Sequence, residues 1–366
     1  MQKELLYQIA LTLVPNIGDV RAKALVNHFG NATAVFHASK KALDAIDGIG
    51  LKAVQSLLNF KDFSRAEEEI SFIKKYKITP LFLTDKNYPQ RLLNCYDSPA
   101  LLYYKGNTDL NSSRMVAIVG TRNHNDYGKN ICEKLVNELV DEEVVIVSGL
   151  AFGIDSIAHK TSVKNNMKTV GVLAHGLDRV YPPQNASLAR QMILNGGLLT
   201  EFKSNTNPDK PNFPGRNRIV AGISDAIIVI ESGIKGGSLI TAELANGYNK
   251  DVFAFPGRAD DLKSAGCNYL IKNNKAMLVT SANDVLENMG WKETKKRSAK
   301  KQRELFIEFT PEEKVVVDIL QMQEQVHIDE LYFKSKLSSS TVAQVLLMLE
   351  MKGLVSSLPG KMYKIS

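Results

Sequence analysis

Between residues 80 and 287 the chain repeats one pattern that restricts its fold more than any other feature: a short apolar run, a glycine-bearing loop and an amphipathic stretch. The runs are rich in Val and Ile and apolar throughout, as strands buried on both faces of a parallel sheet are. Five of them occupy residues 115–119, 144–147, 169–174, 226–230 and 251–255. Their alternation with helices predicts the α/β class, as an extended Rossmann-like, doubly wound parallel sheet. We expect this Rossmann-like domain over residues 77–290.

Residues 1–76 differ, because their apolar residues are spaced close to 3.6 positions apart, which predicts a small all-helical domain. Two similar turns, 14–18 and 46–50, lie 32 residues apart, and each places glycine before a helix. The pattern is that of a helix-hairpin-helix or SAM-like domain, in which free backbone amides suit a phosphate oxygen. A packing module whose turns only need glycine is the alternative, and the sequence leaves both open.

The C-terminal part starts with a basic linker, expected over residues 291–308. Within it, residues 292–303 carry seven cations and one anion, so they supply +6 of the chain's formal net charge of +7. Thr310 and Pro311 then have the chemistry of a helix start. Three helical stretches and a terminal strand pair follow and predict a winged helix over 309–366. The net charge therefore says little about binding elsewhere in the chain.

Apolar runs and cysteines exclude several classes of protein. No run reaches the roughly 18 apolar residues of a membrane helix, and the first residues are too polar for a signal peptide. We therefore expect a cytoplasmic protein with no membrane association. Cys95, Cys132 and Cys267 are odd in number and far apart, so neither a disulfide framework nor a metal site is expected.

Two glycine loops follow predicted strands, at the sheet edge where open α/β sheets bind ligands. In the first, Gly120 frees the backbone to approach an anion, Thr121 adds a hydroxyl and Arg122 adds a fork of donors. The second opens a helix with Gly236, Gly237 and Ser238, whose free amides would seat an anion. A glycine turn needed only for close packing is the alternative. Neither loop has GxGxxG or the Walker pattern, which disfavours NAD and a Walker-type ATPase, and no cofactor is expected.

The region 203–220 is the richest in cations and is expected to form a long loop. Cations neutralise phosphates and a rigid aromatic ring stacks on an unpaired base, so the combination suits single-stranded nucleic acid better than a duplex. The residues expected to act there are Lys203, Lys210, Phe213, Arg216, Asn217 and Arg218. The alternative is a solvated loop whose arginines pair with surface acids.

No nucleophile motif accompanies His159 or His175, so we interpret both histidines as structural and the protein as a binding protein without catalytic residues. An enzyme remains the second hypothesis. The segment around Glu243 weakly matches the glycine-rich motif of Rossmann-like nucleotide phosphoribohydrolases. In that reading the glycines would hold a nucleoside monophosphate and Glu243 would assist cleavage of its glycosidic bond.

Seven motifs together resemble one family. GTRNHNDYG, VSGLAFGIDSIAH, LAHGLDRVYPPQN, FPGRNRIVAGISDAIIVIES, GGSLITAELA and AFPGR follow the Tyr88-Pro89 segment in this order. They are similar to the DNA-processing protein DprA (Smf) family, over residues 80 to 287. The resemblance implies a homodimer that protects single-stranded DNA and loads the RecA recombinase onto it during natural transformation.

The same resemblance implies which residues bind DNA. Arg122, Lys210 and Phe213 would contact the strand, while Gly120, Thr121 and residues 216–218 would line the same phosphate groove. The expected recognition helix of the winged helix carries no Arg or Lys before Lys352, whereas helices that read a DNA groove normally have such donors. We therefore expect an accessory or protein-contact role for this module rather than duplex reading.

Overall fold

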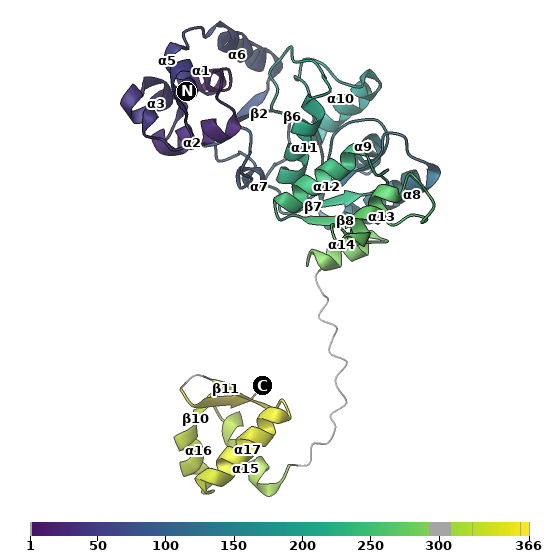
Figure 1. The fold of residues 1–366 in the computed structure, drawn as a ribbon. Helices are drawn as coiled ribbons and strands as arrows, with labels where there is room; N and C mark the ends of the chain where they lie inside the picture. Colours follow the sequence, from purple (N-terminus) through teal and green to yellow (C-terminus); the bar gives the residue numbers. More distant parts are fainter. Residues whose placement is uncertain (1, 293–308, 324, 359, 366) are drawn as a thin grey trace. The chain divides into compact units, whose positions relative to one another are not determined.

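The structure is a computed structural model that describes residues 2–292, 309–323, 325–358 and 360–365. It divides into two compact units, Met1–Lys292 and Glu293–Ser366, which are treated separately (Figure 1). Most of the basic linker expected over 291–308 lies outside the described residues.

A nine-stranded sheet forms the centre of the first unit, in the order β1-β2-β6-β5-β4-β3-β7-β8-β9. All pairs from β6 to β9 are parallel, and β1 and β2 add an antiparallel edge. The strands are β1 (Thr79–Phe82), β2 (Leu101–Gly106), β3 (Met115–Val119), β4 (Val145–Ser148), β5 (Thr169–Val172), β6 (Gly196–Thr200), β7 (Ala226–Val229), β8 (Asp251–Ala254) and β9 (Met277–Leu278). The predicted α/β class and doubly wound sheet are confirmed. The strand order reverses at β3, because β4 and β7 flank it on opposite sides.

Helices cover both faces of this sheet, and alternate residues of β3 show why. Val116 and Ile118 pack with α8, α9 and α14, whereas Ala117 and Val119 face the core that includes α11 and α12. This alternation follows from the two-residue period of a strand. The helices of the α/β part are α7 (Gln90–Leu93), α8 (Asp126–Glu138), α9 (Ile154–Lys164), α10 (Ala186–Leu194), α11 (Asn212–Ile223), α12 (Gly237–Gly247), α13 (Ala265–Lys272) and α14 (Ala282–Asn288), with short 3-10 turns at Val140–Glu142 and Pro183–Asn185.

The N-terminal segment is all-helical, as predicted, and it shares its core with the sheet. Its helices are α1 (Gln2–Leu11), α2 (Asp19–Phe29), α3 (Ala32–His37), α4 (Lys40–Asp44), α5 (Leu51–Asn59) and α6 (Ser64–Tyr76). One continuous apolar cluster contains both Ile9 of α1 and Leu102 of β2. The Lys23 ammonium donates to the carbonyls of Leu93 and Cys95 at 2.6 and 3.0 Å, which fastens α2 to the α/β part.

The second unit has the predicted three helices and terminal hairpin of a winged helix. Its elements are α15 (Pro311–Gln321), β10 (Val326–His327), α16 (Ile328–Ser335), α17 (Ser339–Met351), β11 (Val355–Leu358) and β12 (Met362–Ile365). Thr310 caps α15 through a reciprocal capping box with Glu313, and Pro311 takes the first helical position, as the sequence indicates. The exposed positions of α17 include Leu347, Met348 and Met351.

Candidate nucleic-acid interface

A groove of about 240 Å³ opens at the carboxyl ends of β3, β4 and β7, where the sheet reverses its order. Loops after neighbouring parallel strands converge at this edge, so residues far apart in sequence meet there. Nine of the residues predicted for binding line it: Gly120, Thr121, Arg122, Phe213, Arg216, Asn217, Gly236, Gly237 and Ser238. Lys203, Lys210 and Arg218 are not among its lining residues.

Arg122 and Phe213 form the open side of the groove. The Arg122 guanidinium lies over the Phe213 ring, 5.1 Å from its centroid, in a cation–π contact. Across the described chain Arg122 has no ion pair or side-chain hydrogen bond, and it is exposed. Tyr181 extends the aromatic surface, with its ring 6.1 Å from that of Phe213. The pair therefore offers both an uncompensated cation and a ring face.

The start of α12 also lines the groove. Gly236 occupies the N-cap position, and no side chain caps the helix. A Cβ at Gly237 would meet nothing within 4 Å, so the first turn faces open space. Ser238 donates to the Ser232 hydroxyl at 2.7 Å, which holds the turn in place. Uncapped amides at a positive helix end attract an anion such as a phosphate.

Arg216 forms the floor, but its hydrogen bonds point into the protein. The guanidinium is 4% exposed and donates to the carbonyls of Gly149, at 2.6 Å, and Val172. Burial lowers its pKa to about 10, partly offset by Asp155, whose own pKa is raised by burial. A Cβ at Gly149 would lie 2.5 Å from the Arg216 guanidinium. Arg216 thus shapes the groove and leaves charge neutralisation to more exposed groups.

The structure does not bring Arg218 to the groove. Its guanidinium pairs with Asp19 at 2.9 Å and with Glu201, and it also donates to the Asp97 carbonyl. The region expected to be a loop is helical from Asn212 onward, and residues two apart on a helix point in nearly opposite directions. Arg218 therefore joins α11 to the helical segment and lies apart from the other predicted binding residues.

Two further lysines differ in exposure. Lys203 is half-buried, and burial lowers its pKa. Lys210 is exposed one turn before Phe213, whose amide donates to the Lys210 carbonyl at 3.4 Å. Lys210 is thus an exposed cation three residues before Phe213, whereas Lys203 is partly buried.

The N-terminus of α8 is already occupied by an internal carboxylate, which sequence reasoning missed. Glu231 is fully buried, and its Oε2 accepts a hydrogen bond from the Asn125 amide at 3.1 Å. Its carbonyl accepts from the Thr121 amide at 2.7 Å, and a Cβ at Gly128 would lie 2.4 Å from Oε2. A charged residue directly after a strand and a glycine in the first helical turn are the sequence features that could have indicated this contact.

Both histidines have structural hydrogen bonds. His159 is fully buried, its Nδ1 lies 2.7 Å from the Thr169 hydroxyl, and burial lowers its pKa to about 3. His175 accepts from the Tyr181 amide at Nε2. Glu243, the residue of the hydrolase hypothesis, is exposed, pairs with Lys275 at 2.7 Å and does not line the groove. The described residues contain no cluster of His, Cys, Asp and Glu that could hold a metal ion.

Asp19, the residue after the first of the two glycine turns, packs against the α/β part, whereas Pro15, Asn16 and Gly18 of the turn itself are exposed. Asp19, at the start of α2, accepts from the Ala100 amide at 2.9 Å and pairs with Arg218. Arg21 links both turns by donating to the carbonyls of Asn16 and Gly48. The side chains of Asp19 and Arg21, beside the turns, therefore have structural partners.

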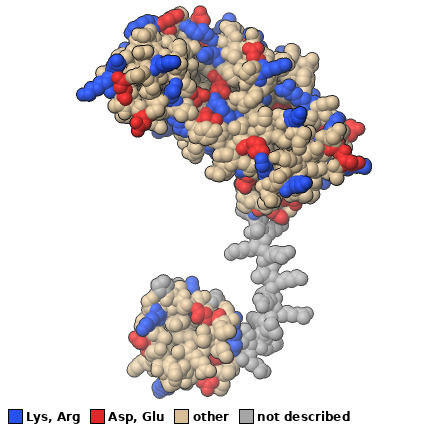
Figure 2. Space-filling view, viewed as in Figure 1, with Lys and Arg blue, Asp and Glu red and all other residues tan. Residues whose placement is uncertain are grey.

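Surface charge agrees with a local site rather than a broad basic field. Lys and Arg alternate with Asp and Glu over the face of the first unit in Figure 2. The groove thus depends on placed groups, namely the exposed Arg122, the aromatic ring of Phe213 and the uncapped start of α12. Fold and groove define a Rossmann-like protein whose sheet edge carries an uncapped helix start, an exposed arginine and an aromatic ring.

The chain belongs to the DNA recombination-mediator protein A family, whose model matches residues 79–290. A second model, the DprA winged helix domain, matches residues 298–361. The DNA processing protein DprA of Streptococcus pneumoniae is 44% identical over 214 residues, 58% of this chain and 75% of that protein. Protein Smf of Synechocystis is 38% identical over 294 residues, 78% of this chain and 72% of that protein.

Solved structures agree with this membership. The crystal structure of DprA from Streptococcus pneumoniae covers 77% of this chain and 97% of its own, with 35% identity and a TM-score of 0.68. DprA from Helicobacter pylori, described in its single-stranded DNA binding mode, covers 58% of this chain and 96% of its own, with 31% identity and a TM-score of 0.53. Within the described residues, no helix has the length and apolar character that crossing a bilayer requires.

Proposed function

We propose that the protein binds single-stranded DNA and acts as a recombination mediator, without catalytic chemistry of its own. The supporting observation is the groove, which is lined by an arginine without an ion pair, an aromatic ring and an uncapped helix start. A phosphate would contact Arg122 and the amides of 236–238, and a base would stack on Phe213. Lys210 would contact the next phosphate along the strand. The family name and the Helicobacter pylori relative, described for its single-stranded DNA binding mode, support this assignment.

The mediator role extends the proposal to partners. Covering the strand against nucleases and passing it to RecA in the cytoplasm, during natural transformation, is the activity that the resemblance implies. A homodimer through the Rossmann-like part would link two grooves, so a strand that spans both would gain affinity without new contacts. The winged helix, with the uncharged residues Leu347, Met348 and Met351 exposed on α17, is proposed as an accessory module for protein contact.

A competition titration tests the binding step. Wild type and Arg122→Glu are titrated with fluorescent single-stranded and duplex oligonucleotides at two salt concentrations. We expect a preference for the single strand, a loss of affinity as salt rises and a dissociation constant raised about 100-fold or more by Arg122→Glu. Lys129→Glu, an exposed change in α8 outside the groove lining, is the matched control and should leave affinity nearly unchanged.

Unchanged affinity in folded Arg122→Glu would overturn the proposed site. Tighter binding to duplex would instead favour DNA reading by the winged helix. The mediator step has its own assay, in which the protein is added to RecA and single-stranded DNA already covered by a single-strand-binding protein. Absence of any acceleration of RecA filament formation would remove that part of the proposal.

A further inference from the structure

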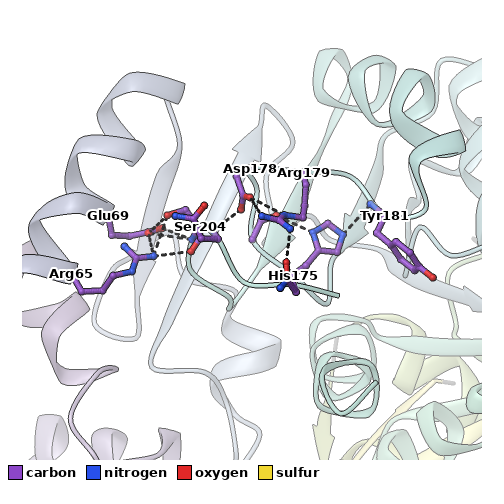
Figure 3. A network of polar contacts seen from close by, with 10 residues as sticks. Arg65, Glu69, His175, Asp178, Arg179, Tyr181 and Ser204 are labelled. Atoms are coloured by element: carbon purple, nitrogen blue, oxygen red, sulfur yellow. Dashed lines mark hydrogen bonds and ion pairs between the residues drawn. The ribbon is translucent and has the colours of Figure 1, made fainter. Parts of the chain in front are cut away.

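A chain of polar contacts runs from the helical segment to the groove. It starts at Glu69 of α6 and reaches residues 204–206. From there it continues through Asp178 to Arg179, and separately through His175 to Tyr181 (Figure 3). Residues 201–211, which connect β6 to α11 and carry Lys210, lie in the middle of this chain. The contacts therefore join two parts of the molecule whose sequences predict separate roles.

Glu69 is the anchor of the chain. Its carboxylate is 1% exposed and accepts from the Ser204 amide at 3.0 Å, the Ser204 hydroxyl at 2.5 Å and Arg65 at 2.9 Å. Arg65 in turn donates to the Ser204 carbonyl at 2.7 Å. Every polar group of Ser204 is thus held by α6. Charge-assisted hydrogen bonds of this kind are the strong ones, and a buried carboxylate binds its donors firmly.

Two routes lead from Ser204 to the aromatic platform. In the first, Asp178 accepts from the Asn205 amide at 2.9 Å and pairs with Arg179, which donates to the Asn207 side chain at 2.5 Å. The Asn207 carbonyl then accepts from Asn212, the residue before Phe213, at 3.0 Å. Each step fixes the backbone leading into α11.

The second route uses the loop after β5. The Gly176 amide donates to the Thr206 carbonyl at 3.2 Å, so this loop lies directly against residues 201–211. His175, its neighbour, accepts from the Tyr181 amide at 3.2 Å. The Tyr181 ring then contacts the ring of Phe213. Both routes therefore end at the ring over which Arg122 lies.

We propose that Glu69 and Arg179 are positioning residues for the single-strand site. The helical segment, through Glu69, then helps to hold the DNA-binding residues in place. The inference rests on the proposed function. Neither side chain needs to touch DNA. They fix where Lys210 and Phe213 lie relative to Arg122 and α12, because a preorganised site loses less entropy on binding than a mobile one.

The affinity test uses full-length Glu69→Ala and Arg179→Gln. Each should weaken single-strand binding about fivefold to tenfold, as expected for lost charge-assisted hydrogen bonds that hold the site. Glu69→Gln keeps an oxygen that accepts from Ser204 and should restore much of the affinity. Two exposed positions provide the controls. Glu67→Ala removes a carboxylate two residues before Glu69 on α6, and Arg190→Gln removes one positive charge on α10, as Arg179→Gln does in its own loop.

A double-mutant cycle separates positioning from general destabilisation. If Glu69 acts through Phe213, then Glu69→Ala should have little further effect on affinity in a Phe213→Ala background. Full additivity of the two changes would overturn the proposal, and so would wild-type affinity in folded Glu69→Ala. Should Glu69→Ala fail to fold, the exposed Arg179→Gln carries the same cycle with the same two outcomes.

A fluorescence readout does not depend on DNA binding. Trp291 is the sole tryptophan, so Trp291→Phe with Phe213→Trp gives one reporter at the platform. Adding Glu69→Ala should shift its emission to the red and Glu67→Ala should not. An unchanged spectrum would contradict the positioning claim. A red shift in a protein that binds no single-stranded DNA would support positioning while overturning the proposed function, so the two failures are distinguishable.

Discussion

The starts of α8 and α12 lie at the same edge of the sheet, follow neighbouring strands and are both rich in glycine, yet only one is open. At α8 the buried Glu231 carboxylate accepts from the Asn125 amide and fills the space beside Gly128. At α12 no side chain caps the helix and the space at Gly237 is empty. A glycine turn before a helix is therefore a potential anion site only when the protein has not supplied the anion itself.

The largest effect should come from removing the Glu231 carboxylate at the start of α8. Glu231→Ala leaves the partly buried Asn125 amide without its acceptor and opens a cavity at the fully buried Glu231 position, which should lower the free energy of unfolding by about 3 kcal/mol. Denaturant unfolding measures this change. Glu231→Gln, which keeps an accepting oxygen, is the matched control, and equal losses in the two variants would contradict the role of the hydrogen bond.

Placing a carboxylate at the uncapped start of α12 should have the next largest effect. Gly237→Asp places a carboxylate at the uncapped start of α12, where it imitates Glu231 and repels a phosphate. The dissociation constant for single-stranded DNA should rise about 30-fold, which corresponds to about 2 kcal/mol. Gly237→Asn has the same shape without the charge and should bind much more tightly than Gly237→Asp. Equal affinities would show that α12 does not seat a phosphate.

The two glycines themselves give a smaller contrast. A Cβ at Gly128 would overlap the Glu231 carboxylate, so Gly128→Ala should cost about 1 kcal/mol or more of unfolding free energy. Gly237→Ala meets open space, and alanine favours helix, so it should be neutral or stabilising by about 0.5 kcal/mol. Thermal unfolding of both variants compares them. A destabilised Gly237→Ala would mean that α12 starts in a conformation that only glycine permits.

The smallest effect concerns pH. Burial raises the pKa of Glu231 above its ordinary value, so the folded protein holds a proton there more tightly than the unfolded chain. Stability linked to this group is therefore greatest below the ordinary glutamate pKa and declines as pH rises through the raised value. Glu231→Gln cannot titrate and should lack this decline. Parallel stability curves for wild type and Glu231→Gln between pH 4 and pH 7 would contradict it.

Much of the fold could be predicted because it depends on local patterns. The five apolar runs correspond to β3, β4, β5, β7 and β8; the ends of β3 agree, and those of the other four differ by at most two residues. The Gly-Gly-Leu-Leu-Thr strand β6, its antiparallel neighbour β2 and the edge strands β1 and β9 were not identified, since they are short or lie at the sheet's antiparallel side. Loops after parallel strands converge by topology, which is why most of the predicted binding residues meet in one groove.

The errors in the site have a common cause. Treating 203–220 as one loop ignored Pro211 and Pro214, which suit the first turn of a helix, and so placed Arg216 and Arg218 on the same side. The helix separates them, and their partners come from distant parts of the chain, such as Asp19 and Val172. The buried carboxylate of Glu231 was not predicted for the same reason, because a hydrogen bond between residues far apart in the sequence leaves no local pattern.

The apolar core shared by α1–α6 and the sheet has a consequence for how the chain comes apart. Because Ile9, Leu102 and Leu239 belong to one cluster, the helical segment cannot leave without exposing the interior of the α/β part. Lys23 adds three hydrogen bonds across the same boundary. The first 292 residues should therefore melt in one cooperative transition, with the winged helix melting independently. A fragment beginning at residue 77 would expose the apolar surface that the helical segment covers, and exposed apolar surface favours aggregation.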